Sequence, residues 1–166
     1  MRDSDGDLAT FLKNKKKKEE LLDEKVIVNW FIQILFGISV LHSKKVLHRD
    51  LKSANIFLTS NKTIKIGDFG ISKVLDNTSA KTFVGTPYYL SPEVCENRPY
   101  DFKSDIWSLG CILYELCTLS VLTMNIQYPF QASNLLGLAM KILNDKVEPI
   151  SSQYPAELNE IVMYTN

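Results

Sequence analysis

Apolar residues recur at steps of three and four along one stretch of the chain, which contains Val26, Ile27, Trp30, Phe31, Ile34, Leu35, Ile38 and Leu41. Residues at this spacing share one face of an α-helix. Asp23 or Glu24 begins the helix, and the pair Lys44-Lys45 suits its C-terminal end, where the helix dipole favours cations. The pattern therefore predicts a long helix with Trp30 and Phe31 in the protein core.

A second stretch, Ser104 to Leu119, is apolar on nearly all sides. A helix without a polar face must be buried. This stretch therefore predicts a buried helix that begins at Ser104 or Asp105. Cys111 and Cys117 are then core thiols rather than nucleophiles.

Two short runs, Ile56-Phe57-Leu58 and Ile64-Lys65-Ile66, flank the turn-forming cluster Ser60-Asn61-Lys62. Apolar runs on either side of such a cluster predict two strands joined as a hairpin. A further helix is expected to start near Pro155-Ala156. Together these patterns predict a mainly α fold with a small β component (α+β), and the length of 166 residues suits one domain.

The segment before the long helix is strongly charged. Lys13 and the run Lys15 to Lys18 are followed by Glu19-Glu20 and Asp23-Glu24, which compensate the lysines locally. A nuclear-localisation signal or an anionic-surface patch would have this kind of lysine run. The local compensation favours a solvated linker between helices instead.

The first residues carry Asp3, Asp5 and Asp7 at alternate positions, as a calcium-binding loop does. Such a loop needs glycine at its sixth position and glutamate at its twelfth, where this chain has Leu8 and Asn14. A calcium site is therefore disfavoured.

The overall composition adds constraints on partners and location. Hydrophobic residues make up 45% of the chain and charged residues 23%, with a net charge of zero, which gives no indication of nucleic-acid binding. Three cysteines without a Cys-x-x-Cys pair favour reduced thiols, and the acidic N-terminus does not resemble a secretory signal. We expect no membrane-spanning run and an intracellular, cytoplasmic location.

Three groups suited to binding metal and phosphate stand close together in the sequence. Asp50 and Asn55 lie five positions apart on one loop, and Asp68 follows the second predicted strand. Mg²⁺ takes hard oxygen ligands and keeps several waters, so one carboxamide and one carboxylate are enough to hold it. Asp50 is then the metal-free carboxylate that accepts a hydroxyl proton, and Lys52 is a point charge for a phosphate. This spacing predicts phosphoryl transfer, which needs positioning and charge neutralisation.

Three motifs in this region resemble those of protein kinases. They are His48-Arg49-Asp50-Leu51-Lys52-Ser53-Ala54-Asn55, Asp68-Phe69-Gly70 and Gly85-Thr86-Pro87-Tyr88-Tyr89-Leu90-Ser91-Pro92-Glu93. They occur in the order found in the family. The sequence in and around these motifs is most similar to that of the NIMA-related (Nek) serine/threonine kinases, and the resemblance covers roughly residues 6 to 155.

The resemblance implies an enzyme that transfers the γ-phosphate of ATP to Ser or Thr of a protein substrate, with Mg²⁺. It assigns Asp50, Lys52 and Asn55 to catalysis, and Asn55 and Asp68 to magnesium. In the same way it implies cytoskeletal or nuclear association.

Other positions acquire roles from the same resemblance. Asp7 matches a position that contacts the ATP ribose, Phe57 matches one beneath the adenine, and Asp68 also belongs to the nucleotide site. His48 resembles a structural histidine that packs beneath Phe69 and hydrogen-bonds backbone, rather than a general base.

The stretch between the second and third motifs resembles an activation loop. Thr82 matches the main phosphosite of Nek-like kinases, modified by an upstream kinase or by autophosphorylation, and Thr78 and Ser79 are further candidates. A phosphate there adds about −1.5 to −2 charge and would pair with Arg49. Thr86 resembles the residue that bonds the catalytic aspartate and lysine, which favours Ser/Thr over Tyr specificity.

The chain also departs from the family. Met1 falls just after the interlobe hinge, so we expect a partial kinase domain over residues 1–166: a C-lobe with the N-lobe absent and negligible activity in isolation. Residues from about 120 to 128 are an atypical insertion. In the family Glu93 pairs with an arginine in the segment beyond Asn166, where this chain stops. Glu93 is therefore expected to face only water or to remain an unpaired buried charge, which predicts marginal stability.

Two other functional classes fit parts of the sequence. A naturally truncated pseudokinase would keep the fold and bind partners as a regulatory module without transfer. A metal-dependent phosphohydrolase would use the same carboxylates, but the sequence has no further metal-ligand cluster.

Overall fold

A computed structural model describes residues 4–18, 20–67, 87–118 and 128–165, with the side chains of residues 4 and 5 left out of the description. The helices are α1 (Leu8–Lys17), α2 (Glu24–Ser43), α3 (Pro92–Cys95), α4 (Phe102–Cys117), α5 (Leu135–Asn144) and α6 (Ala156–Thr165). The strands are β1 (Ser4–Asp7), β2 (Ile56–Thr59) and β3 (Ile64–Ile66), and two short 3₁₀ turns are η1 (Ser53–Asn55) and η2 (Pro87–Tyr89). The fold is predominantly helical with one small antiparallel sheet, as predicted.

The sheet has the order β1-β2-β3, and all its pairs are antiparallel. The hairpin of β2 and β3 is confirmed, with Phe57 opposite Lys65. Strand β1 was not predicted, because Ser4 to Asp7 is polar and has no alternation of apolar and polar residues. This strand forms by pairing with β2, and the pairing places Asp7 opposite Phe57.

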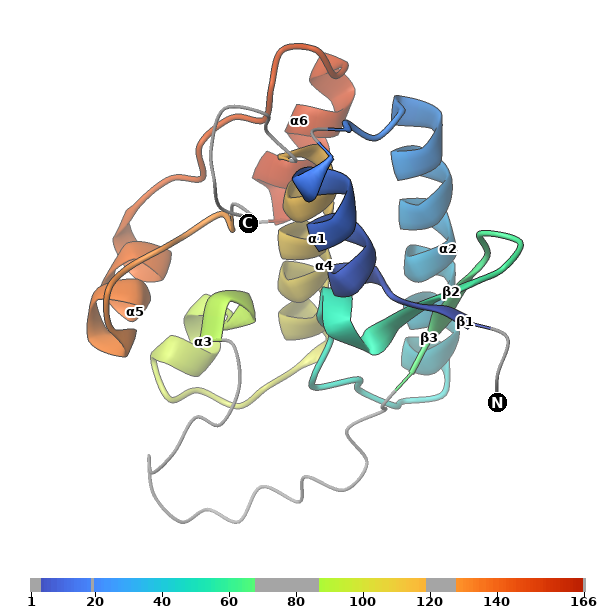
Figure 1. The fold of residues 1–166 in the computed structure, drawn as a ribbon. Helices are drawn as coiled ribbons and strands as arrows, with labels where there is room; N and C mark the ends of the chain where they lie inside the picture. The colour runs from blue at the N-terminus through green and yellow to red at the C-terminus, as the bar shows by residue number, and fades with distance from the viewer. Residues whose placement is uncertain (1–3, 19, 68–86, 119–127, 166) are drawn as a thin grey trace.

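Helix α4 runs through the middle of the domain, with α2 packed along one side and α6 behind it (Figure 1). Of its 16 residues, 13 are buried, which confirms the predicted buried helix. The helix begins at Phe102, slightly before the predicted start. The reason is a capping box between Asp101 and Ser104, in which the Asp101 side chain accepts the Ser104 N–H and the Asp101 N–H donates to Ser104 Oγ at 3.2 Å. The Asp101 carboxylate also accepts the Lys103 N–H at 2.7 Å.

Helix α2 begins at Glu24 behind an Asp23 cap and ends at Ser43, as predicted. Its buried residues are Ile27, Trp30, Phe31, Ile34 and Ile38. The expectation that the chain has no membrane-spanning run needs correction, since α2 is long and apolar enough to cross a membrane by length and composition. Core helices pass the same test, and this one packs against α4 and β3.

The lysine-rich segment is helix α1, so the interpretation as a solvated linker was wrong. Asp7 caps this helix: its Oδ1 accepts the Thr10 N–H at 2.7 Å and its Oδ2 accepts the Thr10 hydroxyl at 2.8 Å. Leu8 and Leu12 are fully buried, while lysines fill the last turn, where the helix dipole favours them. The burial of Leu8 and Leu12, one residue in each turn, is enough to anchor this helix. The run of lysines made the helix hard to predict from the sequence.

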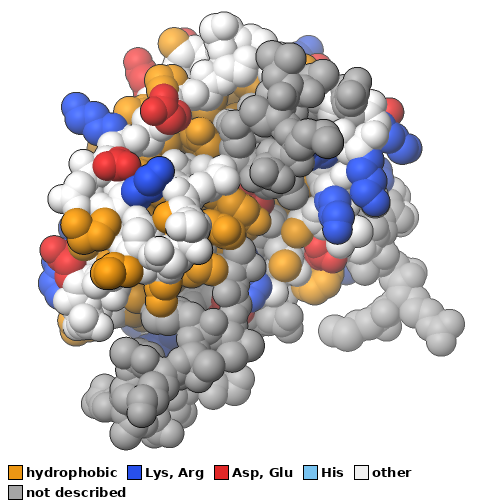
Figure 2. Space-filling view, turned by 60° about the vertical axis from the view of Figure 1, so that its left-hand side comes forward, with side chains coloured by type: hydrophobic (Ala, Val, Ile, Leu, Met, Phe, Trp, Pro, Cys, Tyr) orange, Lys and Arg blue, Asp and Glu red, His pale blue; other side chains and the backbone are white. Residues whose placement is uncertain are grey.

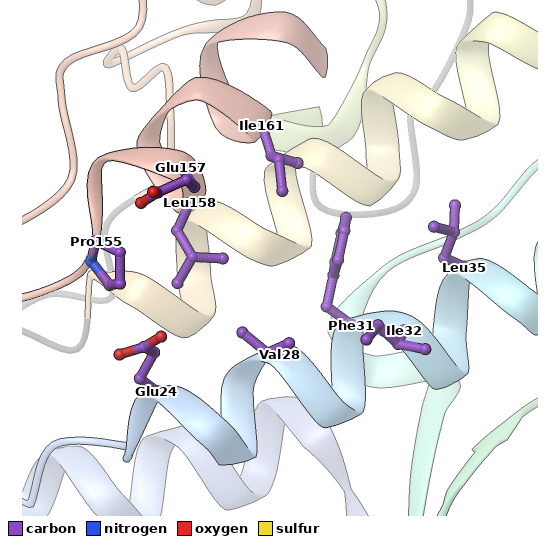
Figure 3. A pocket seen from close by; sticks show the side chains of 9 residues that line it. All are labelled: Glu24, Val28, Phe31, Ile32, Leu35, Pro155, Glu157, Leu158 and Ile161. Carbon is purple, nitrogen blue, oxygen red and sulfur yellow. The ribbon is translucent and has the colours of Figure 1, made fainter.

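Helix α6 starts at Ala156, as predicted, whereas α5 was not foreseen. Between α2 and α6 the surface is hollowed into a groove of about 540 Å³ (Figure 3). Its lining is mostly apolar, with Glu24 and Glu157 on its border, and includes none of the candidate catalytic residues. On the side that carries α5, hydrophobic side chains lie beside both basic and acidic ones (Figure 2).

Candidate active site

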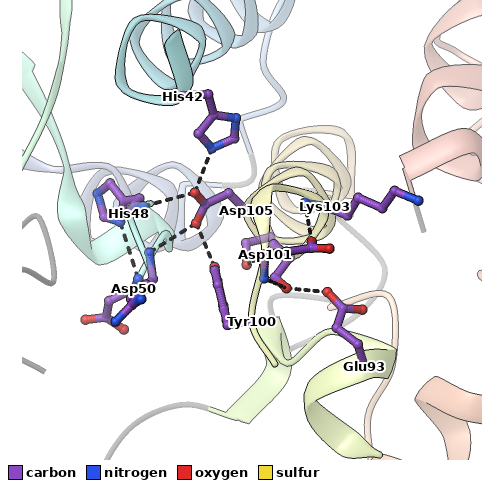
Figure 4. Close-up of polar contacts among 11 residues, drawn as sticks. His42, His48, Asp50, Glu93, Tyr100, Asp101, Lys103 and Asp105 are labelled. Carbon is purple, nitrogen blue, oxygen red and sulfur yellow. Dashed lines mark hydrogen bonds and ion pairs between the residues drawn. The ribbon is translucent and has the colours of Figure 1, made fainter. Parts of the chain in front are cut away.

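The loop that precedes η1 is fixed from below by one buried carboxylate, Asp105 of α4. Its Oδ2 accepts the His48 N–H at 2.9 Å and its Oδ1 accepts the Arg49 N–H at 3.1 Å. Tyr100 OH donates to Oδ1 at 2.7 Å, and the His42 ring nitrogen Nε2 lies 2.8 Å from Oδ2 (Figure 4). Asp105 therefore anchors the backbone of this loop at two consecutive residues.

These contacts explain how the loop keeps an unfavourable backbone conformation. Arg49 has a φ of 67°, in the left-handed region, where a residue with a side chain is disfavoured by roughly 1–2 kcal/mol. A fully buried carboxylate needs donors for its lone pairs. Two consecutive backbone N–H groups satisfy that need only when the chain turns at Arg49, so α4 determines the shape of the loop.

His48 is fully buried beneath this loop. Its Nε2 lies 3.1 Å from the carbonyl oxygen of Gly67, the residue that precedes Asp68, and its Nδ1 lies 3.4 Å from the Asp50 N–H. The ring therefore connects the Asp50 loop to the end of β3. This is a structural position, as the sequence indicated, and Phe69 lies outside the described residues.

Asp50, Lys52 and Asn55 come together at the surface end of the loop. Lys52 Nζ lies 2.9 Å from Asp50 Oδ2, and Asn55 Nδ2 donates to Asp50 Oδ2 at 3.0 Å and to the Asp50 carbonyl at 2.8 Å. Both donors approach the same carboxylate oxygen. Among the described residues no hydrogen bond reaches Oδ1 of Asp50, so this oxygen is open to a further hydrogen-bond donor.

The side chain of Asn55 is oriented by its two partners, which are both acceptors and so require the NH₂ group. Its Oδ1 accepts no hydrogen bond within the described ranges and suits a hard cation such as Mg²⁺. No group of three or more His, Cys, Asp or Glu in those ranges could hold a metal. The donor set fits magnesium, therefore, only together with a carboxylate such as Asp68, which lies outside the described residues.

Phe57 and Asp7, the two residues expected near the nucleotide, are neighbours across the sheet. The Asp7 carboxylate also has the structural duty of capping α1. Phe57 lies against Gly67, where a Cβ would collide with the phenyl ring. The glycine before Asp68 is therefore required by close packing.

The remaining predicted site residues are only partly described. The Arg49 side chain is exposed, and Thr82 and Thr86 lie outside the described residues, as does Asp68. Glu93 is half-buried, and the expectation that it faces only water or remains unpaired was wrong, because it accepts a hydrogen bond from the Ser104 hydroxyl (Figure 4). The first turn of α4 thereby supplies a hydrogen-bond donor to the Glu93 carboxylate.

A second buried carboxyl group, Glu115 of α4, was not foreseen. It contacts the hydroxyl groups of Ser53 and Tyr89, and burial raises its pKa to about 7 against the opposing effect of those two hydrogen bonds. The apolar pattern of α4 assigned this face to the core. A glutamate inside this apolar stretch was the signal available in the sequence, but its partners are 26 and 62 residues away in the chain.

The site is typical of phosphotransfer enzymes. It combines a helical fold, a loop held by a buried carboxylate, and the cluster of Asp50, Lys52 and Asn55. The family model of the protein kinase domain matches residues 3–163, so the chain belongs to the protein kinase family.

Its relatives include NIMA-related enzymes. Mouse serine/threonine-protein kinase Nek1 is 47% identical over 159 residues, which cover 95% of this chain and 12% of Nek1. Mouse Nek3 is 48% identical over 159 residues, covering 95% of this chain and 29% of Nek3. A probable serine/threonine-protein kinase nek2 of Dictyostelium discoideum is 42% identical over 163 residues, 96% of this chain and 37% of that protein. The chain thus spans a minor part of each of these relatives.

Proposed function

We propose that the protein carrying this chain is a serine/threonine protein kinase, which transfers the γ-phosphate of ATP to a Ser or Thr hydroxyl of a protein substrate. The observation that carries the proposal is the cluster of Asp50, Lys52 and Asn55 on a loop anchored by Asp105. The family membership and the names of the Nek relatives support it. By its resemblance to the part of Nek kinases that follows the interlobe hinge, the chain is proposed to be the helical lobe of a larger kinase domain. It spans 12% of Nek1 and 29% of Nek3.

Asp50 is proposed as the group that accepts the substrate proton. Its Oδ2 is held by Lys52 and Asn55, which leaves Oδ1 to approach the hydroxyl. A positioned carboxylate of this kind contributes about 10²–10⁴ in rate as a general base. The proton of the attacking hydroxyl would pass to Oδ1 as the hydroxyl oxygen bonds to the γ-phosphorus, while the bond from that phosphorus to the β,γ-bridging oxygen breaks and ADP leaves.

Lys52 and Asn55 would act on the phosphate side. When bound, Mg²⁺ neutralises charge on the phosphate oxygens. Asn55 Oδ1, and Asp68 by family resemblance, would hold it. The Lys52 ammonium already lies beside Asp50, so it can place positive charge next to the oxygen that attacks. Phe57 and Asp7 are proposed to contact the adenine and ribose.

Regulation and location are part of the same proposal. Thr82 is proposed as a phosphosite that pairs with Arg49, whose exposed side chain is compatible with this role, and Thr86 as a contact of Asp50 and Lys52. An intracellular location is supported by the three cysteines, which form no disulfide.

The experiment that tests the proposal uses two proteins. One is the 166-residue chain, and the other is a chimera in which the chain follows the preceding part of the mouse Nek3 kinase domain. Transfer from γ-labelled ATP to a general protein substrate is measured with Mg²⁺. We expect turnover from the chimera, negligible turnover from the chain alone, and a loss of ~10²–10⁴ in the Asp50→Asn chimera.

Asn29→Ala, an exposed change on α2, serves as the control in the same chimera. A chimera that folds and binds ATP but transfers phosphate equally well with and without Asp50 would contradict the assigned base. A folded chimera without any transfer would contradict the kinase proposal itself.

A further inference from the structure

Three oxygen-bearing side chains from distant parts of the chain meet below the catalytic loop. Glu115 lies in α4, Ser53 in η1 directly after Lys52, and Tyr89 in η2. Ser53 Oγ lies 3.0 Å from Glu115 Oε2, Tyr89 OH contacts Glu115 Oε1, and the two hydroxyl oxygens are 3.0 Å apart. Every pair in this set is within hydrogen-bonding distance.

Counting protons shows which charge state satisfies these contacts. Each hydroxyl has one proton to donate, and an ionised carboxylate has none. With Glu115 ionised, only two protons are present for three contacts. With Glu115 as a neutral acid there are three, so Glu115 can donate to Ser53, Ser53 to Tyr89, and Tyr89 back to the other oxygen of Glu115.

The surroundings of Glu115 also favour the neutral acid. The residue is 1% exposed, and no Lys or Arg among the described residues pairs with it. An unpaired charge in such a place costs several kcal/mol. Burial accordingly raises the Glu115 pKa to about 7.

The other titratable groups that face this set do not compete for the proton. They are Tyr89 from η2, Cys111 from α4 and Tyr128, whose ring lies edge-on to Tyr89. Burial raises the pKa of all three, and the Glu115 charge raises each further. Near pH 7 they remain neutral, so Glu115 alone changes charge.

We propose that Ser53, Tyr89 and Glu115 form a closed ring of three hydrogen bonds around a neutral carboxylic acid, and that this ring positions η2 against the catalytic loop. Ser53 belongs to the same turn as Asn55, which bonds Asp50. Tyr89 belongs to η2, the turn that begins at Pro87 of the Gly85-Thr86-Pro87 motif. Tyr89 and Glu115 are thus positioning residues for the transfer, a role that rests on the proposed function.

Ionisation of Glu115 would remove one proton from the ring and place a charge in an apolar site. The contact between η1 and η2 then weakens as the pH rises through 7. Glu115→Gln imitates the neutral acid, because its NH₂ can donate to Ser53 while its oxygen accepts from Tyr89. This variant keeps the ring closed at every pH.

The first test needs no phosphate transfer and uses the full 166-residue chain. The ¹³Cδ resonance of Glu115, assigned by its loss in Glu115→Gln, is followed from pH 5 to 9 in the folded protein. We expect it to titrate near pH 7. Amide exchange at Ser53, whose N–H points to Tyr89 OH, should accelerate roughly fivefold over this range beyond the intrinsic pH effect, and should not do so in Glu115→Gln.

Glu157→Gln, the same change at an exposed position of α6, is the matched control and should behave as the unsubstituted chain. A Glu115 carboxyl that is already ionised at pH 5.5 would overturn the ring. Equal exchange acceleration in the unsubstituted chain and in Glu115→Gln would overturn the link to the loop.

The second test measures transfer by the chimera described above. We expect Glu115→Gln to flatten the fall in kcat between pH 6.5 and 8.5, while Tyr89→Phe, which opens the ring, lowers kcat at every pH. Identical pH profiles for the unsubstituted and Glu115→Gln chimeras would overturn the positioning role. If Glu115 titrates as expected but the chimera transfers no phosphate, the proposed kinase function is contradicted, whereas the hydrogen-bonded ring is still supported.

Discussion

Asn55 donates both of its amide hydrogens to Asp50, one to the backbone carbonyl at 2.8 Å and one to the carboxylate Oδ2 at 3.0 Å. This pair of bonds closes the loop that starts at Asp50 and ends in η1. It fixes which carboxylate oxygen of Asp50 is engaged and which oxygen of Asn55 remains open. The proposed base and the proposed metal ligand therefore orient each other.

Asn55→Ala should consequently impair more than metal binding. The substitution removes both hydrogen bonds, one of them to a charged group, worth roughly 1–3 kcal/mol. We expect transfer by the chimera to fall about tenfold to a hundredfold and the Mg²⁺ concentration for half-maximal rate to rise. Steady-state rates across a magnesium titration measure both. If saturating magnesium restored the full rate, Asn55 would be only a ligand and not an orienting group.

Asp105→Asn should destabilise the folded chain. The carboxylate accepts backbone N–H groups of His48 and Arg49 and the Tyr100 hydroxyl, and an amide turns an NH₂ group toward one of these donors. Each buried donor left unmet costs roughly 1–3 kcal/mol. Urea unfolding should give a free energy of unfolding that is lower by about this amount, with a lower urea midpoint. Asp145→Asn, at an exposed position, should change both little. Equal midpoints for the two variants would contradict the anchoring role.

Asp7 is predicted to have a stability role that can be separated from its nucleotide role. Asp7→Ala removes the cap of α1 and should cost ~0.5–2 kcal/mol in urea unfolding, whereas Asp7→Asn should retain most of the stability because asparagine also caps helices. A rise in the KM for ATP in the Asp7→Asn chimera would then reflect the carboxylate itself. Similar losses of stability in both variants would argue against the cap.

The cysteines should differ in reactivity. Burial raises the pKa of Cys117 to about 12, and burial and the Glu115 charge raise that of Cys111. Burial and the charges of Glu93 and Glu96 also raise the pKa of Cys95, but this thiol is only half-buried. Since the thiolate is the reactive form and forms only as the pH approaches the pKa, Cys117 stays protonated at pH 8. Iodoacetamide at pH 8 followed by mass spectrometry should modify Cys95 first, and the other two only in denaturant. Rapid modification of Cys117 in the folded chain would contradict its burial.

Much of the site was visible in the sequence because it is local. Asp50, Lys52 and Asn55 lie within six positions, so their spacing alone indicated a common loop. The periodicity of residues 26–41 predicted α2, because a helix buried on one face has apolar residues at steps of three and four. The continuous apolar stretch around Ile112 predicted α4, because a helix buried on all sides has no polar face. The hairpin of β2 and β3 followed from its turn residues for the same reason.

What the sequence did not show depends on contacts between distant residues. Strand β1 exists because β2 offers it an edge, and α1 exists because Leu8 and Leu12 find a core, although lysines dominate the segment. Glu93 obtains its partner from Ser104, and Glu115 meets Ser53 and Tyr89, only after α4 has packed. By itself the sequence indicated α2, α4 and the start of α6, and it indicated that Asp50, Lys52 and Asn55 share one loop, since these features depend on neighbouring residues. Only the tertiary structure decided which buried carboxyl groups hold that loop, because burial and hydrogen-bond partners are properties of the packed chain.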